Sequence, residues 1–298
     1  LMMICLMLTG IAVGRAAKSA GIVAGDVRWT ALVAPLVPLV TFRIDPLATL
    51  LAVVAFVLSF VAWRPGGLWA GLAAVAAKGW PVVLAPVEWW AGRRKRAALL
   101  VAFTVVLAGG LLLTPGFQEG RDFSGIQLET IAGSALIWLR SITGGDSGLF
   151  TAAGAAYVEA PAAALLFGVA LAGMALWFTR SMWRREVNVA HAAQAIGVMT
   201  MALLLFSPLL SAQFILWLTP WLVFFPTGRS QPLFIVLGGV TLVLLLHWAP
   251  HNVVWQTGLL VRNGLLLATA VEMIRVVRLP SLPEPSPAPS ILETAQDS

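Results

Sequence analysis

Charged residues are scarce in this sequence, and this scarcity argues against an ordinary soluble protein. Only 11% of the 298 residues are Asp, Glu, Lys or Arg, whereas soluble domains carry about 25%. Hydrophobic residues make up 59%, and the mean hydropathy is +0.90. Apolar segments such as 99–113, 162–178 and 232–246 are long enough, or nearly so, to cross a hydrocarbon core of about 30 Å. They lack the period-two alternation of strands, so we expect an all-α, polytopic integral membrane protein.

Cysteine and histidine are also rare. The single cysteine, Cys5, excludes a disulfide framework and a cysteine-based metal site. The three histidines (His191, His247 and His251) are too few and too scattered to predict a metal cluster. We therefore expect a chemistry that needs neither a metal nor a cofactor.

Basic residues outnumber acidic ones, 19 to 13, and they gather at the ends of apolar segments. The clusters are 93–96, Arg180 with 184–185, Arg229, and Arg275 with Arg278. Positive residues in this position mark the cytoplasmic side of a membrane protein, which argues against nucleic acid as the partner. Counting crossings from 93–96 places the long polar segment 115–160 outside.

The apolar pattern predicts about nine transmembrane helices. The expected ranges are 1–13, 29–42, 46–63, 97–114, 161–179, 189–207, 211–226, 232–248 and 253–275. A basic loop with Arg15, Lys18 and Arg28 is expected after the first of them. Because the sequence opens in the middle of an apolar segment without a methionine, we expect that the natural N-terminus lies upstream.

Three further segments complete the predicted architecture. Segment 66–91 is too short for two full crossings and is broken at 78–81, which predicts two half-helices in a re-entrant hairpin. Segment 126–138 has the apolar spacing of an amphipathic helix lying on the outer membrane face. The Pro- and Ser-rich tail 280–298 is expected to be disordered and cytoplasmic, separate from a transmembrane domain over 1–279.

Charged residues at two breaks between apolar segments are candidate site residues. Asp45 directly precedes Pro46, where it is expected to cap the helix 46–63. In the functional alternative, Arg43 faces an anionic group while Asp45 orients it or contacts a sugar. Lys78 lies in the hairpin break, and a lysine at membrane depth is either a functional residue or one that snorkels to the interface.

Polar residues near the C-terminal end form a second group. Ser211, Gln213 and Trp217 suit a sugar site, with hydroxyl, amide and stacking face, or ordinary interhelical hydrogen bonds with an aromatic belt. Arg262 and Asn263 lie inside the last apolar helix. They are expected either to satisfy a buried carbonyl or to supply a second cation for a lipid phosphate.

The order of these motifs along the chain carries a family resemblance. The motifs are Arg43-Ile44-Asp45, the small-residue run 66–77, Lys78-Gly79-Trp80-Pro81 with Pro86, the basic cluster 93–96, Gly125-Ile126-Gln127-Leu128-Glu129-Thr130, Ser207-Pro208, Gln213-Phe214 with Trp217 and Pro220, and Arg262-Asn263. Over most of residues 29–275 the chain resembles the polytopic glycosyltransferases of the GT-C superfamily. It is most similar to glycosyltransferase family 87, the mannosyltransferase-like bacterial membrane proteins.

The resemblance implies transfer of a sugar, with mannose as the first candidate, from a polyprenyl-phosphate donor to a lipid or glycan acceptor. It places the site at the outer face of the cell membrane, and it places the catalytic base in an outer loop upstream of residue 1. On this interpretation Lys78, Arg43 and Arg262 bind the donor phosphate. Sugar or acceptor contacts are assigned to Asp45, Gln127, Glu129, Gln213 and Trp217. The alternatives are a secondary transporter, or a flippase for lipid-linked sugars, without transferase chemistry.

Overall fold

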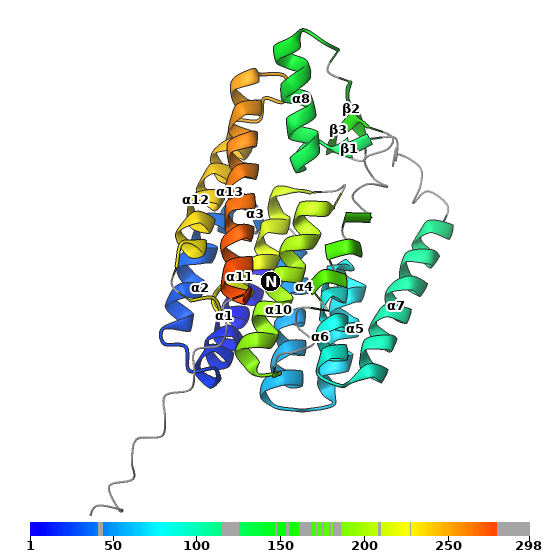
Figure 1. The fold of residues 1–298 in the computed structure, drawn as a ribbon, viewed down its shortest axis with the longest axis vertical. Helices are drawn as coiled ribbons and strands as arrows, with labels where there is room; N and C mark the ends of the chain where they lie inside the picture. The colour runs from blue at the N-terminus through cyan, green and yellow to red at the C-terminus, as the bar shows by residue number, and fades with distance from the viewer. Residues whose placement is uncertain are drawn as a thin grey trace, which may run out of the picture.

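The computed structural model is mostly helical, with one small sheet at an end of the helix bundle (Figure 1). It describes residues 1–40, 44–114, 125–146, 148–152, 155–160, parts of 169–180, 186–207, 210–226 and 228–278. Arg43, most of the expected helix 161–179, the basic residues 184–185 and the tail 280–298 lie outside the described residues.

The N-terminal helices extend further than the apolar pattern predicts. They are α1 (Met2–Ser19), α2 (Gly25–Val33), the 3-10 turn η1 (Ala34–Leu36), α3 (Val37–Val40), α4 (Asp45–Phe56) and the π-helical turn η2 (Val57–Val61). The predicted basic loop is wrong, because Arg15 and Lys18 lie on α1 and Arg28 lies on α2. Helix α1 continues through Gly10 and Gly14 and ends at Ser19, two residues before Gly21, which has a positive φ of 72°.

The broken segment 66–91 forms two short helices, as predicted. These are α5 (Gly66–Lys78) and α6 (Leu84–Trp90), joined by the 3-10 turn η3 (Trp80–Val83) and followed by α7 (Arg94–Leu113). The break falls at Gly79, whose φ of +47° is a conformation that favours glycine. Lys78 is therefore the last residue of α5.

The polar segment after α7 contains strands that the helical pattern did not predict. The elements are β1 (Gly125–Gln127), α8 (Ile131–Thr143), β2 (Leu149–Ala152) and β3 (Ala155–Glu159). The strands form an antiparallel sheet in the order β1-β3-β2. The predicted helix 126–138 is thus displaced, because its first residues pair with β3 and Thr130 caps α8 by accepting from the Gly133 amide.

The C-terminal elements include one segment that does not form the expected crossing. The elements are α10 (Val189–Phe206), the 3-10 helix η4 (Ala212–Leu218), α11 (Thr219–Leu222), α12 (Ser230–Leu246) and α13 (Val253–Arg278). The prediction of one continuous helix over 211–226 is wrong. Residues 215–225 are instead buried throughout, as expected for a segment that is apolar on all sides and lies in the core.

The helices run up and down between two ends of the molecule (Figure 1). At one end lie the turns between α1 and α2, α4 and α5, and α6 and α7; at the other lie the sheet and α8. Within the described residues, two helices, Met2–Ser19 and Val189–Phe206, are long and apolar enough to cross a membrane. A bundle of nine crossings is therefore not confirmed.

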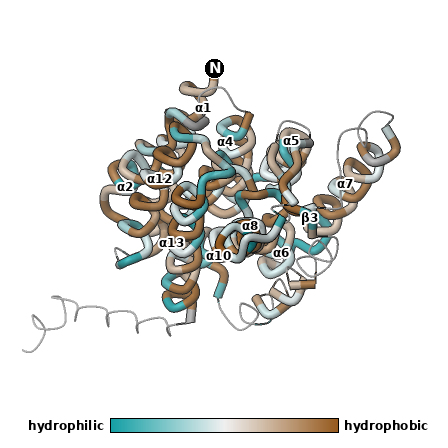
Figure 2. Tube along the Cα trace, turned by 90° about the horizontal axis from the view of Figure 1, so that it is seen from above, coloured by the Kyte–Doolittle hydropathy of each residue, from teal (hydrophilic) through white to brown (hydrophobic). Residues whose placement is uncertain are grey.

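Apolar side chains cover the outside of the bundle as well as its core. Figure 2 shows hydrophobic segments on every side, including the peripheral helix α7. On α7, the exposed residues include Leu99, Val105 and Val106, and Val106 is 72% exposed. Contiguous exposed apolar surface of this kind marks contact with a partner or a membrane.

Candidate functional site

The candidate site is built around Asp45, a buried carboxylate at the start of α4. Asp45 is completely buried, and its side chain makes no capping hydrogen bond to the helix. The expected capping role is therefore wrong. The Oδ1 atom instead accepts a hydrogen bond of 2.8 Å from the indole Nε1 of Trp217, and the ammonium of Lys78 lies 3.6 Å from the same oxygen. Residues from α4, α5 and η4 thus meet at one carboxylate.

Lys78 is held at this point by the end of its helix. As the last residue of α5 it lies where the helix dipole favours a positive charge. Its Nζ atom also lies 5.0 Å from the centroid of the Phe214 ring, a cation–π distance. The side chain of Lys78 is 29% exposed, compared with 1% for Asp45. The cation is therefore the accessible member of the pair.

Aromatic rings hold Trp217 in place. Its indole stacks between Phe214, at a centroid distance of 4.2 Å, and Trp80, at 5.3 Å. Phe214 and Trp217 are three residues apart on the 3-10 helix η4, where side chains at this spacing lie over one another. Sequence reasoning named Trp217 but did not assign Trp80 and Phe214 to the site, although both belong to the quoted motifs.

The second carboxylate oxygen of Asp45 is a buried acceptor. In the part of the chain that the structure describes, Oδ2 has no hydrogen-bond donor. An unsatisfied buried acceptor costs about 1–3 kcal/mol, and an unpartnered polar atom of this kind needs an explanation. A hydroxyl group of a bound molecule is one donor that would satisfy it.

Gln127 and Gln213 belong to β1 and η4, two elements that a hydrogen bond joins. Gln127, at the end of β1, is buried and donates from Nε2 to the hydroxyl of Ser211 at 2.8 Å. Gln213 is half-buried, and its side chain makes no hydrogen bond among the described residues. The Gln127–Ser211 hydrogen bond joins the sheet to the start of η4, and it therefore helps to position the sheet on the helix bundle.

Arg262 and Asn263 hold the turn that contains Glu129. Arg262 is 2% exposed. It donates to the backbone carbonyl of Glu129 at 2.5 Å and lies 3.8 Å from the Glu129 carboxylate. Asn263 donates to the carbonyls of Glu129 and Thr130 and to the hydroxyl of Ser134. Arg262 and Asn263 thus satisfy buried carbonyl groups, which is the first of the two roles expected from the sequence. A phosphate contact by Arg262 stays a prediction.

The site residues therefore form two groups at the end of the bundle that carries the sheet. One group contains Asp45, Lys78 and Trp217, and the other contains Glu129 and Arg262. Gln127 links the two, because it lies two residues before Glu129 and bonds to Ser211 at the start of η4, the element that carries Trp217. Among the described residues, His, Cys, Asp and Glu form no cluster able to hold a metal ion. Comparison with protein-family models, curated proteins and solved structures gave no match to this chain.

Proposed function

We propose that this chain is a membrane-embedded glycosyltransferase that uses a polyprenyl-phosphate sugar, with mannose as the first candidate. The observation that carries the proposal is the convergence of Asp45, Lys78 and Trp217, which come from three separate motifs of the family resemblance, at one buried point. The acceptor is a lipid or glycan, and the site faces the outside of a multi-pass protein.

A location in the membrane is supported by the exposed apolar surface and by the distribution of positive charge. Arg64 and the cluster 93–96 lie at the α4–α5 and α6–α7 turns, at the end of the bundle opposite the sheet. Basic residues collected at one end match the cytoplasmic side of a membrane protein. The Asp45 group lies at the other end, where α4 begins and α5 stops, and this supports an outward-facing site.

The chemistry proposed for the site is charge stabilisation with positioning. In the transfer, a base removes the proton of the acceptor hydroxyl, the hydroxyl oxygen bonds to the anomeric carbon, and the bond from that carbon to the phosphate oxygen breaks. Lys78 is the accessible cation of the site and would stabilise the negative charge on the departing polyprenyl phosphate. Arg43 is a further candidate for the phosphate, and no residue of this chain is assigned as the base.

The remaining residues suit recognition of a sugar. The second oxygen of Asp45 can accept a hydrogen bond, and the Gln213 amide can donate and accept. Trp217 is 6% exposed and has Phe214 and Trp80 stacked against it, so its proposed role is to hold Asp45 Oδ1 rather than to stack on a sugar. Gln127 ends β1 and Glu129 lies on the turn that follows, which α13 holds through Arg262. Their proposed role is to contact the acceptor or to position the turn.

The proposal is tested in proteoliposomes that contain a radiolabelled polyprenyl-phosphate mannose and a membrane extract as the source of acceptor. We expect a new labelled glycolipid, and we expect it to be lost with Lys78→Met but not with Lys95→Met, which removes a positive charge at the other end of the bundle. Movement of the intact donor between leaflets without a new product would instead identify a flippase, and uptake of a soluble solute would identify a transporter.

A further inference from the structure

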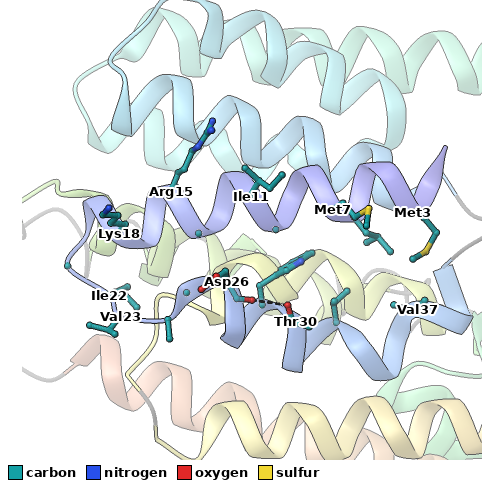
Figure 3. Close-up of a pocket in the computed structure, with 18 residues that line it drawn as sticks. Met3, Met7, Ile11, Arg15, Lys18, Ile22, Val23, Asp26, Thr30 and Val37 are labelled. Atoms are coloured by element: carbon teal, nitrogen blue, oxygen red, sulfur yellow. Dashed lines mark hydrogen bonds between the residues drawn. The ribbon is translucent and has the colours of Figure 1, made fainter.

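A groove between α1 and α2, whose lining contains none of Asp45, Lys78 and Trp217, combines an apolar wall with a basic end (Figure 3). Its volume is about 1090 Å³, just above the range of about 300–1,000 Å³ found for small-molecule pockets. Met3, Met7 and Ile11 of α1 line it along its length, and Arg15 and Lys18 are lining residues near the turn to α2. In Figure 3 Lys18 lies at the turn, and the Arg15 side chain extends from the side of α1 away from α2.

We propose that this groove binds one anionic membrane phospholipid, with the phosphate at Arg15 and Lys18 and an acyl chain along Met3, Met7 and Ile11. The inference rests on the proposed membrane location but not on transferase activity. The lipid comes from the leaflet on the side of the basic turns, because the α1–α2 turn lies at the same end of the bundle as Arg64 and 93–96.

The charges of the groove favour an anion at one end. Arg15 and Lys18 are three residues apart on the last turns of α1, so they lie on neighbouring positions of one face. Both are exposed, and neither forms an ion pair with another described residue. Asp26 is the one acid in the lining, so the lining carries two positive charges and one negative. Basic pockets between helices on the cytoplasmic side bind anionic lipid head groups.

The apolar wall favours a hydrocarbon chain over a free anion. Met7 and Ile11 are 68% and 52% exposed in the groove, and methionine side chains adapt to irregular apolar partners. Trp29 lies against Gly10 of α1, where an added Cβ would come within 2.7 Å of its ring. The glycine therefore lets α2 approach α1 closely. Charge at one end and apolar surface along the length together match a phospholipid.

The experiment uses the purified protein in detergent, with phosphatidylglycerol and phosphatidylcholine as probes and native mass spectrometry as the measurement. We expect phosphatidylglycerol to be retained in preference to phosphatidylcholine. The double variant Arg15→Gln/Lys18→Gln should weaken retention by about tenfold or more. The matched control, Arg94→Gln/Lys95→Gln on α7, removes the same charge at the same end and should stay within about twofold of the parent protein.

A second variant, Met7→Trp, fills the apolar wall without changing the charge and should also reduce retention of the lipid. Equal losses with the two charge variants, or equal binding of the two lipids, would overturn the proposal. Inorganic phosphate that competes fully while Met7→Trp has no effect would show an anion site instead. A dimer that Met7→Trp dissociates would show that a second copy occupies the groove. Protein that stays monodisperse without detergent would refute the membrane location itself, independently of the lipid.

Discussion

The ion pair between Lys78 and Asp45 gives the sharpest test of the site, because a single substitution of Lys78 cannot separate binding from stability. Lys78→Met leaves the Asp45 carboxylate, with 1% of its side chain exposed, bonded only to the indole of Trp217. Breaking a buried pair in this way costs about 3–5 kcal/mol. Because Lys78 itself is 29% exposed, we expect a loss near 3 kcal/mol, at the lower end of that range.

The double variant Lys78→Met/Asp45→Asn removes both charges together. The amide oxygen that Asp45→Asn introduces can still accept from the Trp217 indole, so the remaining loss is the difference between a charge-assisted and a neutral hydrogen bond, about 1 kcal/mol. The double variant should therefore be more stable than Lys78→Met by about 2 kcal/mol. The coupling energy is the loss of the double variant minus the sum of the two single losses, so its magnitude is about 2 kcal/mol plus the loss that Asp45→Asn causes alone. Unfolding of the four proteins of this cycle, followed in detergent, measures the coupling.

The same four proteins separate the roles of Lys78. If Lys78 stabilises the departing phosphate, the double variant regains stability and still does not transfer sugar. If Lys78 only neutralises Asp45, the double variant regains transfer together with stability. Losses of stability that add within about 0.5 kcal/mol would show that the two residues do not interact, and would refute the ion pair on which this reasoning depends.

Three further predictions address other contacts. Trp217→Phe should keep the stack but remove a donor to buried Asp45, at a cost of about 1.5–3 kcal/mol in a thermal unfolding assay. Trp80→Phe should be nearly neutral in the same assay, because the Trp80 Nε1 has no partner among the described residues. Similar losses for both variants would contradict the hydrogen bond from Trp217 to Asp45. Arg262→Lys should destabilise the protein by about 1–3 kcal/mol, because a lysine ammonium cannot reproduce the guanidinium hydrogen bonds to both Glu129 and Asn263. An unchanged unfolding temperature would show that these hydrogen bonds do not contribute to stability. Single cysteines at positions 95 and 145, in a Cys5→Ala background, should label from opposite sides of sealed vesicles, and labelling from one side would refute the proposed orientation.

Much of the helical framework follows from the sequence alone, since long apolar segments have few alternatives to helix. The spans that became α7, α10, α12 and α13 were predicted close to their observed ends, and the predicted span 46–63 became α4 together with η2. The break after Lys78 was also predicted, because Gly79 and Pro81 interrupt an otherwise helical run. Helix propensity and the positions of glycine and proline are local properties of the chain, so they can be read from the sequence.

The sheet and the position of 211–226 were decided by tertiary structure. The strands have three to five residues each and pair across as many as 34 positions, as Gly125 does with Glu159. A single short strand has little periodic signal, and only its partner defines it. Segment 211–226 has the hydropathy of a membrane helix, but its burial on all sides and its contact with α4, α10 and α12 place it inside the bundle.

The candidate site divides in the same way. The sequence supplied the residue types, because a carboxylate, a lysine and a tryptophan at breaks in apolar segments are unusual enough to notice. It assigned Asp45 the local role of a helix cap, since a cap needs only residues nearby in the chain. The observed partner, Trp217, lies 172 residues away, and only the packing of η4 against α4 brings the two together. Long-range partners of buried charges depend on the three-dimensional fold, so the sequence could name these residues but not pair them.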